Sequence, residues 1–192
     1  MNLHQLFESE FDEHGSVLEE TKNGVYKPLS LLIKATAEAV ENGGKILFFG
    51  NGGSAADAQH LSTELVIRYK DDRKPVPSIA LTTDSSAITA GANDIGFNNI
   101  FSRQIEALAK PGDVAIGIST SGNSENVING LIEARKIGAI PAGLGGKGGG
   151  RRVEVADPYL VVPSYTTARI QEMHILIGHI FCDALERKLN LI

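Results

Sequence analysis

The chain has 192 residues, of which 42% are hydrophobic and 21% charged, so it can bury a core without disulfides or a structural metal. Its formal net charge of −5 argues against a nucleic-acid binder held by general positive charge, although a local anion site built from amides and hydroxyls is compatible with it. The sequence has no secretory pattern, no apolar run of the ~20 residues that span a bilayer, and one cysteine, Cys182. We therefore expect a cytoplasmic protein with no membrane segment and an inert, buried thiol.

Apolar residues recur at helix-like spacing near the N-terminus. A first run lies within residues 3–18, and a second runs from Pro28 to Val40 before two glycines end it. We predict two helical segments over residues 1–42, followed by an α/β core over residues 45–192, in a single domain.

Five short apolar runs then alternate with longer amphipathic stretches. Each run is followed by glycine, serine or threonine and then by a helical stretch, as is typical of strands buried on both faces of a parallel sheet. The alternation predicts right-handed crossovers and a three-layer α/β sandwich. The last helix, over residues 167–189, is apolar almost all round, which indicates a subunit interface. The predicted strands cover residues 45–50, 78–81, 114–118, 139–144 and 159–162.

A hydroxyl-rich loop, Ser119-Thr120-Ser121-Gly122-Asn123-Ser124, lies between the third predicted strand and a predicted helix. Ligands of open α/β sheets bind at the carboxyl ends of strands, near helix N-termini. Hydroxyls, backbone N–H groups and the positive end of a helix dipole together predict an anion site, with simple helix capping as the alternative. The loop Gly50-Asn51-Gly52-Gly53-Ser54 has the same character, because its glycines let the backbone approach a ligand closely.

Two further segments carry weaker patterns. Residues 143–148 match G-x-G-x-x-G, but no clear helix follows, no acidic residue suits a ribose ~20 positions on, and no Ser or Thr follows Lys147 as in a P-loop. We interpret the glycine-rich stretch Gly143–Gly150 as a flexible loop. The mixed charges of residues 68–74 are interpreted as a solvated helix end.

His60 and Glu64 are candidate catalytic or metal-binding residues. They are four residues apart on the helix after the first glycine loop, so their side chains share one helix face. They can bind a metal ion together or act on a substrate proton. The alternative is a solvated polar stripe completed by Asp57.

The last helix carries Gln171 and His179 among apolar residues, where buried polar groups need partners. Eight residues correspond to about 12 Å of helix rise, so the two side chains either converge on one ion or serve sites in different subunits. The alternative is that His179 is a core histidine bonded to a carbonyl. By spacing, His174 is also a candidate partner of Gln171.

These segments are similar to the sugar isomerase (SIS) domain family, and the resemblance narrows to the phosphoheptose (sedoheptulose-7-phosphate) isomerases. It rests on residues 50–54, on 117–124 and on Ala168-Arg169-Ile170-Gln171-Glu172-Met173-His174, and it covers nearly the whole chain. It implies a flavodoxin-like fold with a five-stranded parallel sheet, and a homotetramer with active sites at subunit contacts. It also implies conversion of sedoheptulose 7-phosphate to D-glycero-D-manno-heptose 7-phosphate, the first committed step to the heptose of bacterial surface polysaccharide.

The resemblance implies roles for single residues. Glu64 resembles the catalytic base and His179 its acid/base partner, and one zinc ion per subunit is implied by the members that bind metal. The substrate-binding positions are Asn51, Gly52, Gly53, Ser54, Glu64, Asn93, Asp94, Ser119, Thr120, Ser121, Ser124 and Gln171. The zinc ligands are His60, Glu64, Gln171 and His179.

One position departs from the family pattern. Many members carry an aspartate before Arg169, where this chain has Ala168, so that role is vacant or filled by another residue. A sister branch that binds the bacterial replication initiator shares the segment around Gln171 but lacks the counterpart of His179. Glu64 and His179 together therefore favour the enzyme. A sugar-phosphate-sensing module is a third alternative, and we expect no DNA-binding extension.

Overall fold

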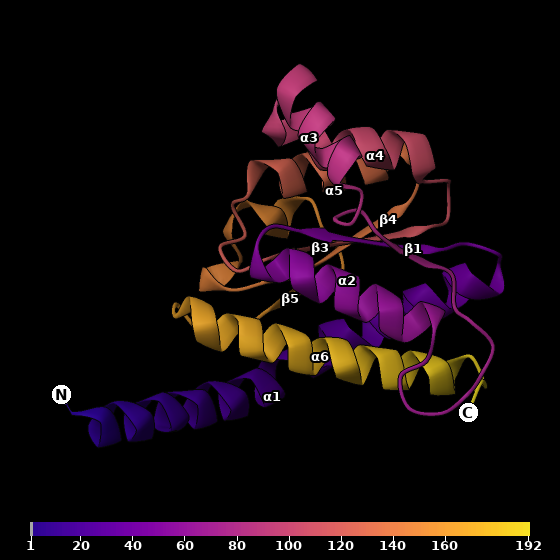
Figure 1. The fold of residues 1–192 in the computed structure, drawn as a ribbon. Coiled ribbons are helices and arrows are strands. Elements are labelled where there is room, and N and C mark those ends of the chain that lie inside the picture. The colour runs from indigo at the N-terminus through magenta and orange to yellow at the C-terminus, as the bar shows by residue number, and fades with distance from the viewer. Residues whose placement is uncertain (1) are drawn as a thin grey trace.

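The computed structural model describes residues 2–192, apart from the side chains of Arg152 and Val153, and has three layers (Figure 1). Five parallel strands form one sheet in the order β2-β1-β3-β4-β5, which confirms the predicted strands and the α/β class. Gly50 pairs with Ile118, and Ser119 with Gly145, so the carboxyl ends of β1, β3 and β4 lie together. The strands are β1 (Ile46–Gly50), β2 (Ser78–Ala80), β3 (Val114–Ser119), β4 (Ile140–Gly145) and β5 (Tyr159–Val161).

Helices cover both faces of the sheet (Figure 1). Because successive side chains of a strand point to opposite faces, β1 contributes side chains to a hydrophobic core on each face of the sheet. Phe48 is buried with Leu61 on the face of α1, α2 and α6, and Phe49 is buried with Phe101 on the face of α4 and α5. No helix in residues 2–192 is long and apolar enough to cross a membrane. The helices are α1 (Leu3–Glu41), α2 (Gly53–Val66), α3 (Ser85–Asp94), η1 (Phe97–Asn99), α4 (Ile100–Leu108), α5 (Glu125–Ile137), η2 (Lys147–Glu154) and α6 (Thr167–Lys188).

The prediction of two N-terminal helical segments is wrong, because α1 is one helix that contains Pro28. A proline inside a helix removes one backbone donor and crowds the carbonyl four residues earlier. Buried Val25, Leu29 and Leu32 belong to the same hydrophobic core as the inner face of α6, on both sides of the proline. Tertiary packing therefore holds α1 together through the defect. Residues 2–12 are exposed and project from the body (Figure 1).

The glycine-rich stretch Gly143–Gly150 is also not the separate flexible loop that was predicted. Its first three residues belong to β4, and the rest lies in η2 or just before it. Gly148, Gly149 and Gly150 all have positive φ. The sequence pattern did not reveal that Gly149 and Gly150 pack against the loop that follows β3.

Candidate active site

Two loops meet at the carboxyl edge of the sheet, one after β1 and one after β3. The first turns from Gly50 into α2 with little space, because a Cβ on Gly50 would lie 2.7 Å from the carbonyl oxygen of Ile118. Gly52 precedes α2 with a φ of +56°. The glycines of residues 50–53 thus bring a backbone turn and the N-terminus of α2 next to the end of β3.

The loop after β3, residues 119–124, gathers its hydroxyls. The Oγ atom of Ser119 lies 2.9 Å from that of Ser124 and 3.4 Å from that of Ser121. Ser124 is the N-cap residue of α5, yet its side chain makes no capping hydrogen bond. The hydroxyls therefore face one another beside the N-terminus of α5 instead of capping it, which favours the anion-site interpretation over simple capping.

A pair of side-chain amides joins the loop after β1 to the first turn of α5, directly after the hydroxyl loop. Asn51 Nδ2 donates to Asn126 Oδ1, and Asn126 Nδ2 donates to Asn51 Oδ1, both at 2.8 Å. Asn126 is buried in the first turn of α5. Because the bonds are reciprocal, the position of the loop after β1 is fixed relative to the hydroxyl loop.

His60, Glu64 and His179 lie together between α2 and α6. The Nε2 atoms of His60 and His179 are 2.8 Å apart, and Glu64 Oε1 is 3.5 Å from His60 Nε2. Tyr69 stacks on the ring of His179, with 5.5 Å between centroids. The side chain of Glu64 is 18% exposed, so a half-buried carboxylate stands beside two imidazoles that solvent or a ligand can reach.

Gln171 reaches a different part of α2. A Cβ on Gly53 would lie 2.3 Å from Gln171 Nε2, so the amide covers the N-terminal end of α2, two turns before His60. His174 is buried, and its Nε2 atom donates to the carbonyl of Gly145 at 3.0 Å. The core-histidine role that we weighed for His179 therefore belongs to His174, and His179 faces His60.

Comparisons with known proteins place the chain in a family. The family model described as SIS domain matches residues 11–146. A phosphoheptose isomerase from Paramagnetospirillum magneticum is 55% identical over 186 residues, which are 97% of each chain. The solved phosphoheptose isomerase of Francisella tularensis superposes with a TM-score of 0.94 at 36% identity, covering 97% of this chain and 100% of that one. A solved phosphoheptose isomerase from Neisseria gonorrhoeae gives a TM-score of 0.91 at 39% identity, with the same coverage.

The chain belongs to the phosphoheptose isomerase family. Solved sugar-isomerase-type domains at 18% identity or below, such as that of an RpiR transcription factor from Sphaerobacter thermophilus, share the fold alone. Among the residues expected from the phosphoheptose isomerase pattern, the structure brings Ser119, Ser121 and Ser124 together, and it brings His60, Glu64 and His179 together.

Other expected residues lie apart from these groups. Asn93 and Asp94 are exposed at the end of α3, where Asn93 Nδ2 donates to Asp94 Oδ1 at 2.7 Å, and α3 packs on the α4–α5 side of the sheet. Ala168 is exposed in the first turn of α6. The nearby carboxylate of Glu172 is held by Arg169 at 2.6 Å and by His14 at 2.8 Å.

The interpretation of residues 68–74 as a solvated helix end is wrong at Arg73. Its side chain is 1% exposed and pairs with Glu186, whose side chain is fully buried in α6. Arg73 Nη2 also donates to the backbone carbonyl of Glu64 at 2.7 Å. The backbone N–H of Tyr69 donates to Glu186 at 3.4 Å. This buried ion pair thus anchors the segment that positions Glu64 and Tyr69. The mixed charges of residues 68–74 did not predict it.

Asp57 is a second feature that sequence patterns left undecided. It lies one turn before His60 on α2, and its Oδ2 atom is buried without a hydrogen-bond partner in the described part of the chain. Burial raises the pKa of the Asp57 carboxyl from 3.8 to about 6, against the opposing charge of His60. Asp57 is therefore a perturbed carboxyl next to the imidazole pair, which the polar-stripe interpretation does not explain.

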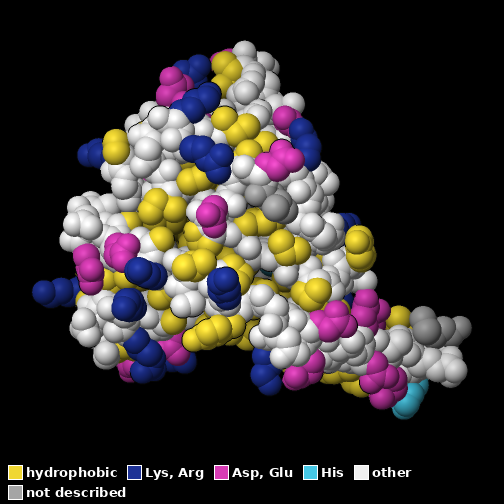
Figure 2. Space-filling view, turned by 180° about the vertical axis from the view of Figure 1, so that it is seen from behind, with side chains coloured by type: hydrophobic (Ala, Val, Ile, Leu, Met, Phe, Trp, Pro, Cys, Tyr) yellow, Lys and Arg dark blue, Asp and Glu magenta, His cyan; other side chains and the backbone are white. Residues whose placement is uncertain are grey.

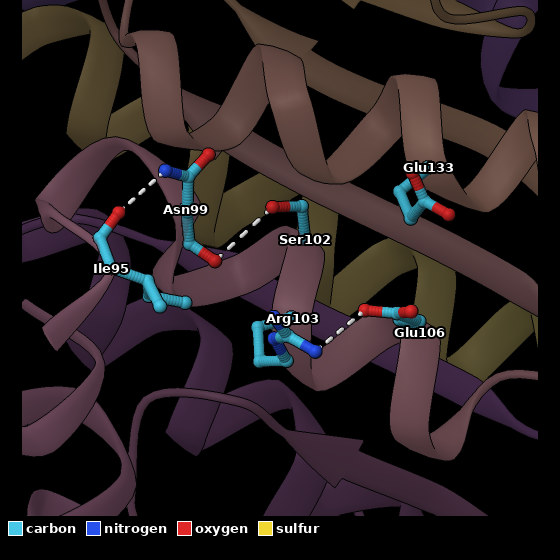
Figure 3. A pocket seen from close by; sticks show the side chains of 6 residues that line it. All are labelled: Ile95, Asn99, Ser102, Arg103, Glu106 and Glu133. Carbon is cyan, nitrogen blue, oxygen red and sulfur yellow. Dashed lines mark hydrogen bonds and ion pairs between the residues drawn. The ribbon is translucent and has the colours of Figure 1, made fainter.

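A groove of about 240 Å³ lies elsewhere, between α4 and α5 (Figure 3). Arg103 and Glu106 pair across 3.2 Å within it, and Asn99 donates to the carbonyl of Ile95. The groove contains none of the residues expected from the family pattern. Its polar side chains are engaged by one another, by backbone carbonyls or by Lys136. We therefore place the candidate site at the loops after β1 and β3 and at the cluster of His60, Glu64 and His179.

Proposed function

We propose that the protein is a cytoplasmic isomerase that interconverts sedoheptulose 7-phosphate and D-glycero-D-manno-heptose 7-phosphate for bacterial surface-polysaccharide heptose. The main support for this proposal is that the side chains of His60, His179 and Glu64 lie together. In addition, the hydroxyls of Ser119 and Ser124 lie together beside the N-terminus of α5. A phosphate at this loop is remote from the reacting carbons, so its binding energy holds the open-chain sugar in place.

The chemistry needs one base and one proton shuttle. Glu64 removes a proton from C1 of the ketose, the C–H electron pair forms the C1–C2 double bond, and the π electrons of the C2 carbonyl move to O2, which gives a cis-enediolate. The proton returns to C2, while His179 moves the hydroxyl proton from O1 to O2, which leaves the aldehyde at C1. A side chain held in reach of the reacting atoms typically contributes about 10²–10⁴-fold in such a proton transfer.

We propose that His60, Glu64 and His179 can hold one zinc ion, whereas the fourth expected ligand, Gln171, lies against Gly53, two turns away along α2. The donor types fit, because two imidazole nitrogens face each other at 2.8 Å with a carboxylate oxygen 3.5 Å from one of them. In residues 2–192, no three His, Cys, Asp or Glu side chains form a finished metal site, so binding requires side-chain rotation. A bound zinc would stabilise negative charge on the enediolate oxygens.

We propose a homotetramer with active sites at subunit contacts. A largely apolar groove of about 300 Å³ between α1 and α6 is lined by Leu18, Tyr26 and Leu176, among others, and Tyr26 is 77% exposed. Exposed apolar surface of this kind marks an interaction site. Seen from behind, hydrophobic side chains also spread over the body, beside the projecting, acid-rich end of α1 (Figure 2). Light scattering coupled to gel filtration measures the molar mass in solution, which tests whether four subunits assemble.

The test is turnover of sedoheptulose 7-phosphate, followed by NMR as aldose formation in buffer with and without zinc. We expect the aldose signals to grow to an equilibrium mixture. No turnover in either buffer, together with saturable binding to a replication initiator, would replace the enzyme with a binding protein. Saturable binding of the sugar phosphate without turnover would indicate a sensor.

A further inference from the structure

The glycine-rich segment after β4 touches the hydroxyl loop directly. A Cβ on Gly150 would lie 2.7 Å from the carbonyl oxygen of Ser121 and 2.8 Å from Oδ1 of Asn123. From the other side, a Cβ on Gly122 would lie 2.0 Å from the carbonyl oxygen of Gly149. The two backbones are therefore so close that a side chain at Gly122 or Gly150 would not fit between them.

Specific bonds hold this contact in place. The backbone N–H of Arg151 donates to Asn123 Oδ1 at 3.1 Å, and its guanidinium pairs with Glu125 in the first turn of α5. Tyr159 OH donates to the carbonyl oxygen of Gly149 at 2.8 Å. The side chain of Tyr159, which starts from β5, thus fixes the segment that leans on the hydroxyl loop.

The glycines of β4 make room for that tyrosine. A Cβ on Gly145 would lie 1.9 Å from Tyr159 OH, and one on Gly143 would lie 3.0 Å from its ring. A Cβ on Gly146 would lie 2.5 Å from Ile170. The first two glycines of the G-x-G-x-x-G pattern, Gly143 and Gly145, therefore have a packing origin, because they leave room for the ring and hydroxyl of Tyr159, and Gly146 leaves room for α6.

We propose that residues 149–151, defined here as the brace, together with Tyr159 position the hydroxyl loop for binding the substrate phosphate. This rests on the proposed function of that loop. The Asn51–Asn126 amide pair holds the loop from the side of β1, and the brace holds it from the side of β4. Tyr159 is a positioning residue, because its hydroxyl bonds Gly149 and acts on the phosphate through the brace. Donors that are fixed in advance bind an anion without first being ordered.

Two variants and one control separate this role from a general effect on folding. Tyr159→Phe removes the bond to Gly149 and conserves the ring. Gly150→Ala is stronger, because φ of +58° and ψ of −158° suit only glycine and the new methyl group collides with the hydroxyl loop. Gly148→Ala is the control, since it also has a positive φ of +75° but its Cβ would meet only Tyr165 OH at 3.9 Å.

The measurements are KM and kcat for sedoheptulose 7-phosphate, the inhibition constant of inorganic phosphate, and the melting temperature. A hydrogen bond is worth roughly threefold to tenfold in affinity, so Tyr159→Phe should raise KM and the phosphate constant by that same factor while kcat stays within about twofold. Gly150→Ala should raise both by at least about tenfold, since bonds to a charged phosphate are stronger. Gly148→Ala should stay within about twofold of wild type.

Wild-type KM and phosphate constants in both Tyr159→Phe and Gly150→Ala would overturn the brace, as would a loss of kcat at unchanged KM. If Gly150→Ala does not fold, Tyr159→Phe alone decides. If the wild-type protein has no isomerase activity, the proposed function fails separately. Calorimetric binding of inorganic phosphate to the same variants then tests the brace without turnover.

Discussion

The buried pair of Arg73 and Glu186 allows a quantitative test of how the active-site segment is anchored. Glu186→Gln keeps an acceptor for the guanidinium but removes the negative charge that pairs with it, at a place where both side chains are at most 1% exposed. Removing one partner of a buried ion pair costs about 3–5 kcal/mol of unfolding free energy. For a chain of this length, 1 kcal/mol corresponds to about 2–4 °C, so the melting temperature should fall by roughly 6–20 °C.

Calorimetry and urea unfolding measure this loss, and α6 offers a matched control. Asp183 also accepts from Lys70 and Arg187, but its side chain is 25% exposed and both cations are largely in solvent. Asp183→Asn should therefore cost less than about 1 kcal/mol. If Glu186→Gln melts within about 2 °C of wild type, the charge of Arg73 is reached by water and the segment is anchored in another way.

Three further outcomes follow from the site. Ser124→Ala should raise KM at least about tenfold with little change in kcat, because the hydroxyl holds the remote phosphate throughout the reaction; a wild-type KM in steady-state kinetics would show that the phosphate does not bind the Ser124 hydroxyl. Asn126→Asp replaces one bond of the amide pair with repulsion between two oxygens and adds negative charge beside the phosphate, so KM should rise more than for Asn126→Ser, and equal KM values would show that the amide pair does not control the loop. Burial raises the pKa of the Cys182 thiol to about 12, so the native protein should not react with a thiol reagent at pH 8 until it is unfolded; rapid labelling of the folded chain would contradict the packing around α6.

Much of the architecture follows from local patterns. Residues 46–50 and 114–118 are short, continuously apolar and followed by polar turns, and both lie in inner strands whose residues are buried on both faces. The end of α1 was also predictable from Gly43 and Gly44. Its continuity was not, because Pro28 is a valid stop signal that only the packing of α1 against α6 overrides.

The site was predictable in its residue types more than in its contacts. The hydroxyl loop and the pairing of His60 with Glu64 follow from spacing along the chain. The contact between His60 and His179 joins residues 119 positions apart, so nothing local encodes it. The same is true of Arg73 with Glu186 and of Gly150 with Ser121, because Arg73 and Gly150 lie in segments whose composition is typical of solvated loops and their partners are far away in the sequence.

The central claim is that Glu64 and His179 move protons on the substrate, and solvent exchange in the Glu64→Gln and His179→Gln variants tests it most directly. With sedoheptulose 7-phosphate in D₂O, the wild-type protein should place deuterium at C1 or C2 as the aldose forms, which NMR detects. Each variant should slow both exchange and turnover by at least ~100-fold, with losses far from additive and little change in melting temperature. Near-normal exchange in variants that melt many degrees lower would contradict the account, because it would make both residues structural and would assign the proton transfer to other groups.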